Sequence, residues 1–289
     1  IKSLIVLDHS EFNLYNIKKE IDQFFDANPN KIQTFFLLGT ITDLDFVKNV
    51  FSTYNIHIVF HAAAYKHVNI VENNVVSSIK NNLIGTYNLS NVADKYKIEK
   101  FVLVSTDKAV RPTNIMGASK RLSEICIHLI SKRSKTIFST VRFGNVIGGR
   151  MTHGVIVDFI ERLKNNPDKL LIFGNGKQEK NYFLVEECIN GMAYAFRNIR
   201  MDKDKPCDIL NLGADSITKV IDIAEIIKDE MDLLNADIEI EGKEYAWPGD
   251  QPRVHISVEK MNKYGWSTEL DSDQAVRIAV QRMLNKENL

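Results

Sequence analysis

The segment KFVLVSTDKAVRPTNIMGASKRLSE, residues 100–124, decides the fold class. Its apolar run Phe101–Val104 predicts a buried strand, and the residues from Met116 to Ser131 predict a helix. The polar residues 105–108 leave the strand at its carboxyl end, which is where open α/β sheets bind ligands. The segment therefore predicts one unit of a parallel α/β sheet with polar side chains at the ligand-binding edge.

The same alternation extends to both sides of this segment. Strands are predicted at Leu4–Leu7, Thr34–Leu38, Ile56–Phe60 and Thr136–Val141, and helices at 11–25, Leu44–Phe51 and Val75–Tyr96. Short β-rich runs that alternate with helices predict right-handed βαβ units. We expect an α/β fold with a doubly wound, Rossmann-like parallel sheet, the first βα unit of which is missing from this chain.

After about residue 145 the alternation is less regular. Helices are predicted at Val155–Leu163, Glu186–Ala195, Val220–Leu233 and Asp271–Leu284, and strands at Leu170–Phe173 and Ile209–Leu212. The last helix is expected to have its N-cap near Ser272. Residues 202–206 predict a solvated loop. We expect two domains, 1–150 and a smaller α/β domain at 151–289.

Composition narrows the class of protein. The 289 residues are 44% hydrophobic, and 37 Lys and Arg balance 37 Asp and Glu. A folded chain without net charge is not expected to have a strong general affinity for nucleic acid or anionic membranes, although a local basic site is compatible with it. No apolar run approaches the length of a membrane span. Three unpaired-looking cysteines and no metal-ligand spacing predict a reducing, cytoplasmic setting without a metal site.

Asp8 ends the first predicted strand, the position at which dinucleotide-binding folds hold the adenosine ribose. A carboxylate there accepts hydrogen bonds from the ribose hydroxyls and repels a 2′-phosphate, which favours NAD over NADP. Only seven residues precede Asp8, and they hold no glycine-rich turn. Either the first βα unit is missing from the chain or the cofactor hypothesis is wrong. The alternative is an Asp that only caps the next helix.

Residues 61–67, His-Ala-Ala-Ala-Tyr-Lys-His, follow the third predicted strand. Small residues at a strand's carboxyl end let a flat ligand lie against the backbone. Lys66 and His67 would then stand at the mouth of a cleft. The alternative is a small-residue packing site beside solvated polar neighbours.

Asp107 and Lys108 place an acid and a base side by side after the fourth predicted strand. Lys120 lies one helical turn after Met116, so the two side chains share one face of their helix. This combination favours proton transfer over a plain surface ion pair.

These residues resemble the extended short-chain dehydrogenase/reductase superfamily, and more narrowly the UDP-N-acetylglucosamine 4,6-dehydratases of polysaccharide biosynthesis. The resemblance rests on LIVLDHSEFNLYNI (4–17), FHAAAYKHVNIVENN (60–74), NNLIGTYNLSNVA (81–93), residues 100–124 and VRFGNVIGGR (141–150). Further along, HGVIVDFIERL (153–163), FGNGKQEKNYFLVEE (173–187), NLGADSITKVIDIAEII (211–227) and AWPGDQPRVHIS (246–257) look more like sugar-nucleotide 4-epimerases.

The resemblance implies a role for each matching residue. NAD would be held by Asp8 at the adenosine ribose, Asp43 near the adenine, Ala62, Ala63 and Lys66 along the pyrophosphate, and Asn82, Ser105 and Lys120 towards the nicotinamide. The sugar diphosphate of a UDP-sugar would be held by Asn145, Lys180 and Arg253, where Lys180 stands in place of the usual Arg. His153 is a further candidate for substrate contact. Relatives commonly form oligomers through helices of the first domain, so a homo-oligomer is expected, with no nucleic acid or membrane partner.

Two departures from the superfamily favour a dehydratase. Met116 stands where the superfamily has its catalytic Tyr, and a thioether cannot act as a base. Lys108 stands where the deoxy-glucose dehydratases have Glu, and the Asp-Lys pair resembles the UDP-N-acetylglucosamine group instead.

The resemblance implies a mechanism. Lys108, neutral, removes the C5 proton, and protonated Asp107 donates to the departing C6 hydroxyl. Thr106, or a water held by Lys120, relays the proton of the C4 hydroxyl. A nucleotide-sugar 4-epimerase and a binding protein without turnover stay open as alternatives, as does inversion at C5.

Overall fold

The computed structural model describes residues 1–28, 32–198, 207–244 and 253–285. The loop expected at 202–206 lies outside these residues. The chain forms two compact units, Ile1–Leu103 with Asn114–Phe138, and Val104–Thr113 with Ser139–Leu289. The second unit thus includes residues 104–113 as well as the chain from Ser139 onward. The domain bounds expected from the sequence, 1–150 and 151–289, stay a prediction.

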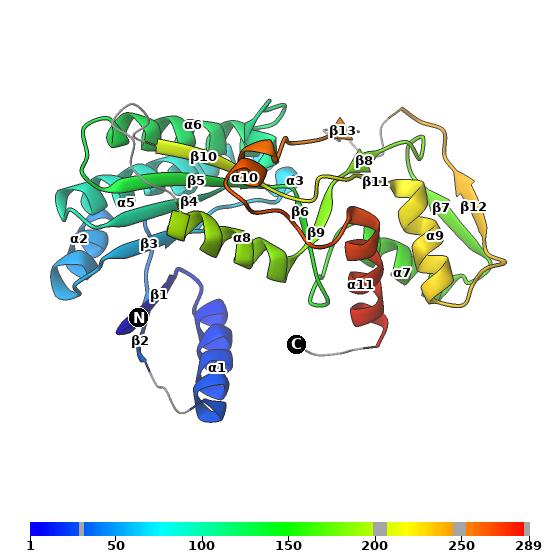
Figure 1. Ribbon diagram of the computed structural model, residues 1–289, viewed down its shortest axis with the longest axis horizontal. Coiled ribbons are helices and arrows are strands. Elements are labelled where there is room, and N and C mark those ends of the chain that lie inside the picture. Colours follow the sequence, from blue (N-terminus) through cyan, green and yellow to red (C-terminus); the bar gives the residue numbers. More distant parts are fainter. Residues whose placement is uncertain (29–31, 199–206, 245–252, 286–289) are drawn as a thin grey trace. The chain divides into compact units, whose positions relative to one another are not determined.

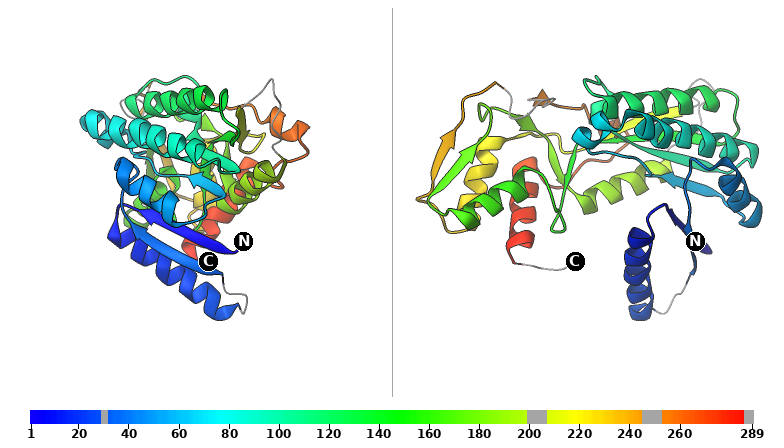
Figure 2. Two further views of the ribbon diagram at one scale, coloured as in Figure 1. Left: turned by 90° about the vertical axis from the view of Figure 1, so that its left-hand side faces the viewer. Right: turned by 180° about the vertical axis from the view of Figure 1, so that it is seen from behind.

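The first unit alternates strands and helices as expected. Its strands are β1 (Ser3–Asp8), β2 (Gln33–Leu38), β3 (Ile58–His61) and the first parts of β4 (Lys100–Thr106) and β5 (Ile137–Phe143). Its helices are α1 (Glu11–Ala27), α2 (Leu44–Thr53), α3 (Val68–Asn73), α4 (Val75–Ile79), α5 (Gly85–Lys95) and α6 (Ile115–Ser131). Helix α5 packs against α6 on one side and α2 on the other, and the views in Figure 2 show these helices in a row.

Parallel pairing joins the strands of this unit. β3 pairs with β4 from Ile58 opposite Lys100 to His61 opposite Leu103, and β1 pairs with β2 in a two-stranded sheet of its own. The larger sheet has the order β10-β5-β4-β3 (Figure 1), with β10 at Cys207–Leu212. Because β3 and β4 are parallel, the segments that follow them leave at the same edge of the sheet.

The long helix expected at Val75–Tyr96 is interrupted by a π-helical turn at Lys80–Ile84. The carbonyl oxygen of Asn82 accepts the hydroxyl protons of Thr86 at 2.6 Å and Ser123 at 2.7 Å. Hydroxyls of Ser and Thr that bond a helix carbonyl compete with the backbone ladder, and π-helical turns are often found at functional sites.

The second unit is built from shorter elements. Its remaining strands are β6 (Asn145–Ile147), β7 (Lys169–Ile172), β8 (Glu179–Lys180), β9 (Tyr182–Leu184), β11 (Thr218–Lys219), β12 (Asp237–Ile240) and β13 (Arg253–Val254). Its helices are α7 (Val155–Asn165), α8 (Val185–Asn198), α9 (Val220–Glu230), α10 (Glu259–Lys263) and α11 (Ser272–Leu284), and a 3₁₀ turn spans Asp107–Ala109.

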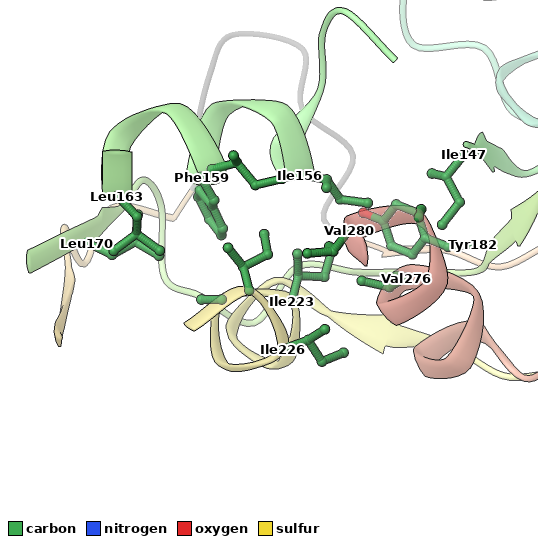
Figure 3. Close-up of a cluster of buried hydrophobic side chains, with 14 of the residues drawn as sticks. Ile147, Ile156, Phe159, Leu163, Leu170, Tyr182, Ile223, Ile226, Val276 and Val280 are labelled. Carbon is green, nitrogen blue, oxygen red and sulfur yellow. The ribbon is translucent and has the colours of Figure 1, made fainter. Parts of the chain in front are cut away.

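One apolar core holds these elements together. Figure 3 shows side chains from α7, α9 and α11 converging, among them Phe159, Ile223 and Val276. All three are at most 3% exposed. This core fixes α7 and the strands that follow it, which form the wall of the cavity described below.

One of two expected helix ends is confirmed and the other is wrong. The N-cap of α11 is Asp271, next to Ser272: the Asp271 carboxylate accepts the N–H of Gln274, while Ser272 Oγ accepts the N–H of Tyr182. Helix α9 ends at Glu230, ahead of the expected residue 233. Asp232 has a positive φ of 56°, a conformation that an α-helix does not contain.

Candidate active site

Two carboxylates stand at the start of helices in the first unit. Asp8 ends β1, and its Oδ1 accepts the backbone N–H of Ser10 at 2.7 Å. Asp43 is the N-cap of α2, and its Oδ1 accepts the N–H groups of Asp45 and Phe46, both at 3.0 Å. In each case Oδ2 has no hydrogen-bond partner among the described residues. Both side chains therefore cap a turn and still offer one oxygen to a ligand.

The loop between β3 and α3 is held in place by Asn82. Its carboxamide accepts the N–H of Tyr65 at 2.8 Å and donates to the carbonyl oxygen of Tyr65 and to Ser119 Oγ, both at 3.0 Å. Asn82 is fully buried, so it positions the loop and does not face a ligand. Ala62 and Ala63 of this loop are exposed, which leaves a backbone surface without large side chains.

His61 and Lys120 form a buried, electrostatically coupled pair. Burial lowers the pKa of His61 to about 3, and the charge of Lys120 acts in the same direction. Thr86 donates its one hydroxyl proton to Asn82, so it accepts the N–H of His61 Nε2 at 2.7 Å. His61 is thus neutral with a fixed tautomer, and it supports the π-helical turn.

Lys120 is a buried lysine with altered acidity. Burial lowers its pKa to about 8, and the Glu124 carboxylate opposes that shift. A lysine in this range exchanges protons readily near neutral pH. Met116 is also buried, one turn earlier on the same helix, so a thioether occupies the position expected for a catalytic hydroxyl.

Thr106, Asp107 and Lys108 form a compact polar group at the end of β4, directly after buried Ser105. Asp107 Oδ1 accepts the Thr106 hydroxyl at 2.7 Å, the Lys108 N–H at 2.8 Å and the Lys108 ammonium at 3.2 Å. Asp107 Oδ2 is buried and has no hydrogen-bond partner among the described residues. An unsatisfied buried acceptor is costly, so this oxygen marks a place where a ligand's polar group can bind.

Asn145 is held by a crossing of three chain segments. Its backbone N–H and its carboxamide both donate to the carbonyl oxygen of Asn181, at 3.1 and 3.3 Å. The Asn181 carboxamide in turn donates to the carbonyl of Ala214 at 3.2 Å. A Cβ at Gly144 or Gly213 would lie 2.6 Å from the Asn181 carboxamide, so both positions require glycine.

The second unit contains a cavity of about 450 Å³, a size common for small-molecule sites. Lys180 and His153 line it together with Phe173, Tyr182 and Asp158. Of the predicted substrate residues, Lys180 therefore lies in a cavity.

Arg253 lies in β13 beside β8, and its side chain is 81% exposed. Its Nε donates to Glu179 at 2.6 Å, so the guanidinium is already partly engaged.

Several residues of these clusters were not predicted. In the sequence, His61 is one residue of a small-residue segment. No motif marks Ser119, Thr86, Ser123 or Asn181. Lone hydroxyl and amide residues are common in helices and loops, and only the fold makes them partners of Asn82 or Asn145.

Within the described ranges, no group of three His, Cys, Asp or Glu side chains is arranged to hold a metal ion. No helix in the described part of the chain is long and apolar enough to cross a bilayer.

Solved structures identify the class of fold. The chain aligns over 98% of its length with 99% of a UDP-glucose 4-epimerase from Thermotoga maritima, solved with UDP-glucose, at a TM-score of 0.78 and 19% identity. It also aligns over its whole length with 98% of a dTDP-glucose 4,6-dehydratase from Bacillus anthracis str. Ames, solved with NAD, at a TM-score of 0.77 and 17% identity. These likenesses confirm the expected Rossmann-like α/β fold.

The family described as polysaccharide biosynthesis protein matches residues 1–244, so the chain belongs to that family. The expected family resemblance is thereby confirmed. The probable polysaccharide biosynthesis protein EpsC of Bacillus subtilis (strain 168) is 42% identical over 149 residues, 52% of this chain and 24% of EpsC. The dTDP-D-glucose 4,6-dehydratase of Mus musculus is 27% identical over 304 residues, 96% of this chain and 82% of that enzyme. The match thus covers about a quarter of the length of EpsC.

Proposed function

We propose that the chain is an NAD-dependent nucleotide-sugar 4,6-dehydratase that converts UDP-N-acetylglucosamine to a 4-keto-6-deoxy sugar nucleotide. The observation that carries the proposal is the buried Asp107 carboxylate, with Thr106 and Lys108 on one oxygen and no partner on the other. The related dehydratase of Mus musculus, which aligns with most of the chain, supports the same reaction class.

The residues of the first unit fit a dinucleotide. Asp8 has a free carboxylate oxygen at the end of β1, suited to ribose hydroxyls, and Asp43 has another at the start of α2. Exposed Ala62 and Ala63, with Lys66 after them, provide a surface for the pyrophosphate. NAD⁺, when bound, would supply the hydride acceptor for C4 of the sugar and return the hydride at C6.

The polar group after β4 would carry out the elimination. Transfer of one proton from the Lys108 ammonium to Asp107 within their hydrogen bond would leave a free amine and a protonated carboxyl group. The amine then takes the proton from C5, which the neighbouring ketone makes acidic. Asp107 Oδ2, protonated, donates to the C6 hydroxyl, so that the C6–O bond breaks and water leaves. The Thr106 hydroxyl, already directed at Asp107, or a water held by Lys120, relays the proton of the C4 hydroxyl to solvent in place of the absent tyrosine. The Lys108 ammonium exchanges with solvent and delivers a proton to C5, and Asp107 takes up a proton from solvent to complete the cycle.

Lys180, Asn145 and Arg253 would hold the sugar diphosphate. Lys180 contributes a positive charge to the cavity, and the carbonyl of Asn181 fixes the Asn145 side chain. Arg253 would have to leave Glu179 to bind a phosphate, a change that its exposure permits.

Product analysis tests this function. After incubation with UDP-N-acetylglucosamine and NAD⁺, the proposal expects a product lighter by one water. The Asp107→Asn variant keeps the shape of the side chain but removes the acid, and we expect a rate loss of about 10²- to 10⁴-fold. The Lys19→Ala variant, on exposed α1, is the control and should retain full activity. A new sugar isomer of unchanged mass would indicate a 4-epimerase, and tight nucleotide binding without turnover would indicate a binding protein.

We also infer a homo-oligomer and a reducing, cytoplasmic setting. Leu122, Ile125 and Leu129 are 42–58% exposed and lie three and four residues apart on α6. That spacing forms one apolar stripe, opposite the buried face with Ser123 and Ile127, and such a stripe suits packing against a second copy. The three cysteines are all free, as expected in a reducing compartment.

A further inference from the structure

Six basic residues gather where strands β4 and β5 begin. Lys95, Lys97 and Lys100 lie in or beside the turn before β4, and Lys132, Arg133 and Lys135 lie in the turn before β5. We call these six residues the basic edge. Asp94 and Glu99 are the acidic residues in the same two turns, so the excess of positive charge is local in a chain whose net charge is zero.

Backbone and side-chain hydrogen bonds hold the two turns together. The Thr136 hydroxyl donates to the carbonyl oxygen of Ile98 at 2.8 Å, and the Ile137 N–H donates to the carbonyl of Glu99 at 3.0 Å. Both turns lie at the same end of the sheet in Figure 1. The six basic residues therefore belong to one surface, because hydrogen bonds hold the two turns that carry them side by side.

The charges of the basic edge are available to a partner. Lys95, Lys97, Lys132 and Lys135 are exposed, and none of them has an ion pair among the described residues. Two other surface lysines of the same unit do have ion pairs, Lys18 with Asp22 and Lys48 with Asp45. Unpaired lysines held close together repel one another, and a negatively charged surface relieves that repulsion.

We propose that the basic edge docks the protein onto the surface of an anionic lipid bilayer. Clusters of four to eight basic residues are the usual feature by which proteins recognise anionic headgroups. Most of the basic edge is lysine, a compact charge suited to many mobile phosphates, and Arg133 already donates to Asn91. Tyr96 is 40% exposed between Lys95 and Lys97, and tyrosine favours the headgroup region of a membrane.

This docking is compatible with the proposed function but does not depend on it. The basic edge lies where β4 begins, and Thr106 lies where β4 ends. A bilayer bound at the amino-terminal edge of the sheet would leave the carboxyl-terminal edge open to ligands.

Vesicle sedimentation tests the proposal. The chain is mixed with vesicles of phosphatidylglycerol and phosphatidylcholine, or of phosphatidylcholine alone. We expect binding only to the anionic vesicles, and loss of binding when salt is raised from about 0.1 M to about 1 M, because the screening length falls from about 10 Å to about 3 Å. The K97Q/K132Q/K135Q variant should bind about 100-fold more weakly.

A matched control separates this site from general charge. The K19Q/K164Q/K263Q variant loses the same net charge elsewhere and should keep wild-type binding. Equal binding by all three proteins, equal loss in both variants, or binding to neutral vesicles would overturn the proposal. The proposal would also be overturned if a single-stranded RNA bound at the basic edge and anionic vesicles did not bind. The same holds if inorganic phosphate, at the concentration of the lipid headgroups, displaced the vesicles.

Discussion

Lys120 links the stability of the first unit to pH. Burial lowers the pKa of Lys120 to about 8 from an ordinary value of 10.5. Between these values the unfolded chain binds more protons than the folded one, so the free energy of unfolding rises with pH from about 8 to 10.5. Below pH 8 the ammonium is charged in both states, and the folded state carries the whole cost of burying it.

The Lys120→Met variant should therefore be more stable at pH 7, by as much as about 3 kcal/mol, and should lack the rise between pH 8 and 10.5. Urea denaturation across this pH range measures both effects. Lys19→Met, on an exposed face, is the control and should keep the wild-type curve. An unchanged pH dependence in Lys120→Met would show that the buried amine does not titrate in this range. If the variant is also inactive, the buried lysine is retained for function at the expense of stability.

The Asn82 side chain is expected to stabilise the loop that contains Tyr65. The Asn82→Ala variant leaves the Tyr65 N–H and carbonyl groups without partners, which should destabilise the fold by about 3 kcal/mol. Amide hydrogen exchange should become faster at Tyr65. Asn91→Ala, one helical turn after Tyr87 on α5, removes a more exposed hydrogen bond and should cost under about 1 kcal/mol. Unchanged protection at Tyr65 in Asn82→Ala would contradict this assignment.

Among the structural elements, the close approach of Gly144 to Asn181 can be tested by substitution. A Cβ at Gly144 would lie 2.6 Å from Asn181 Oδ1, so Gly144→Ala should destabilise the fold by about 1–3 kcal/mol. Asn181→Ala removes the obstructing group. The double variant should then lose less stability than the sum of the two single variants, a coupling that thermal or urea unfolding can measure. Strict additivity would mean that the two groups do not touch.

The sequence predicts most elements of the first unit but not their irregularities. Apolar runs bounded by turn residues place β2 and β4 within two residues at each end. The π-helical turn at Lys80–Ile84 is missed, because Thr86 and Ser123, whose hydroxyls bond the Asn82 carbonyl within it, look like ordinary helix residues. Two-residue strands such as β8 are too short to give a periodic signal.

The sequence likewise predicts some residues of the candidate site and not others. Asp107, Lys108 and Lys120 are predictable because charged residues at a strand end and one helical turn from a buried thioether are unusual. The long-range partners of the Asn82 and Asn145 side chains, Tyr65, Ser119 and Asn181, are not predictable, since they lie 17 to 37 residues away along the chain. Long-range contacts of this kind depend on the order of the strands, which residue patterns alone do not specify.

At the scale of the whole molecule, the exposed stripe on α6 predicts self-association. Replacing Leu122 and Leu129 by Glu should convert an oligomer into a 33.0 kDa monomer, because charges would be buried at the contact. Light scattering coupled to size-exclusion chromatography measures the mass. Leu234→Glu changes a comparably exposed leucine in the second unit and should leave the oligomer intact. A wild-type chain that is already monomeric would contradict the inference.

We propose that Asp107 and Lys108 eliminate water across C5 and C6 of a nucleotide sugar. The most direct test incubates UDP-N-acetylglucosamine, NAD⁺ and the protein in heavy water and analyses the sugar nucleotide by mass spectrometry. We expect loss of one water and incorporation of one deuterium at C5. In Lys108→Ala, we expect that deuterium incorporation stops while NAD⁺ binding persists. Deuterium at C5 in the Lys108→Ala variant, at the wild-type rate, would contradict the account.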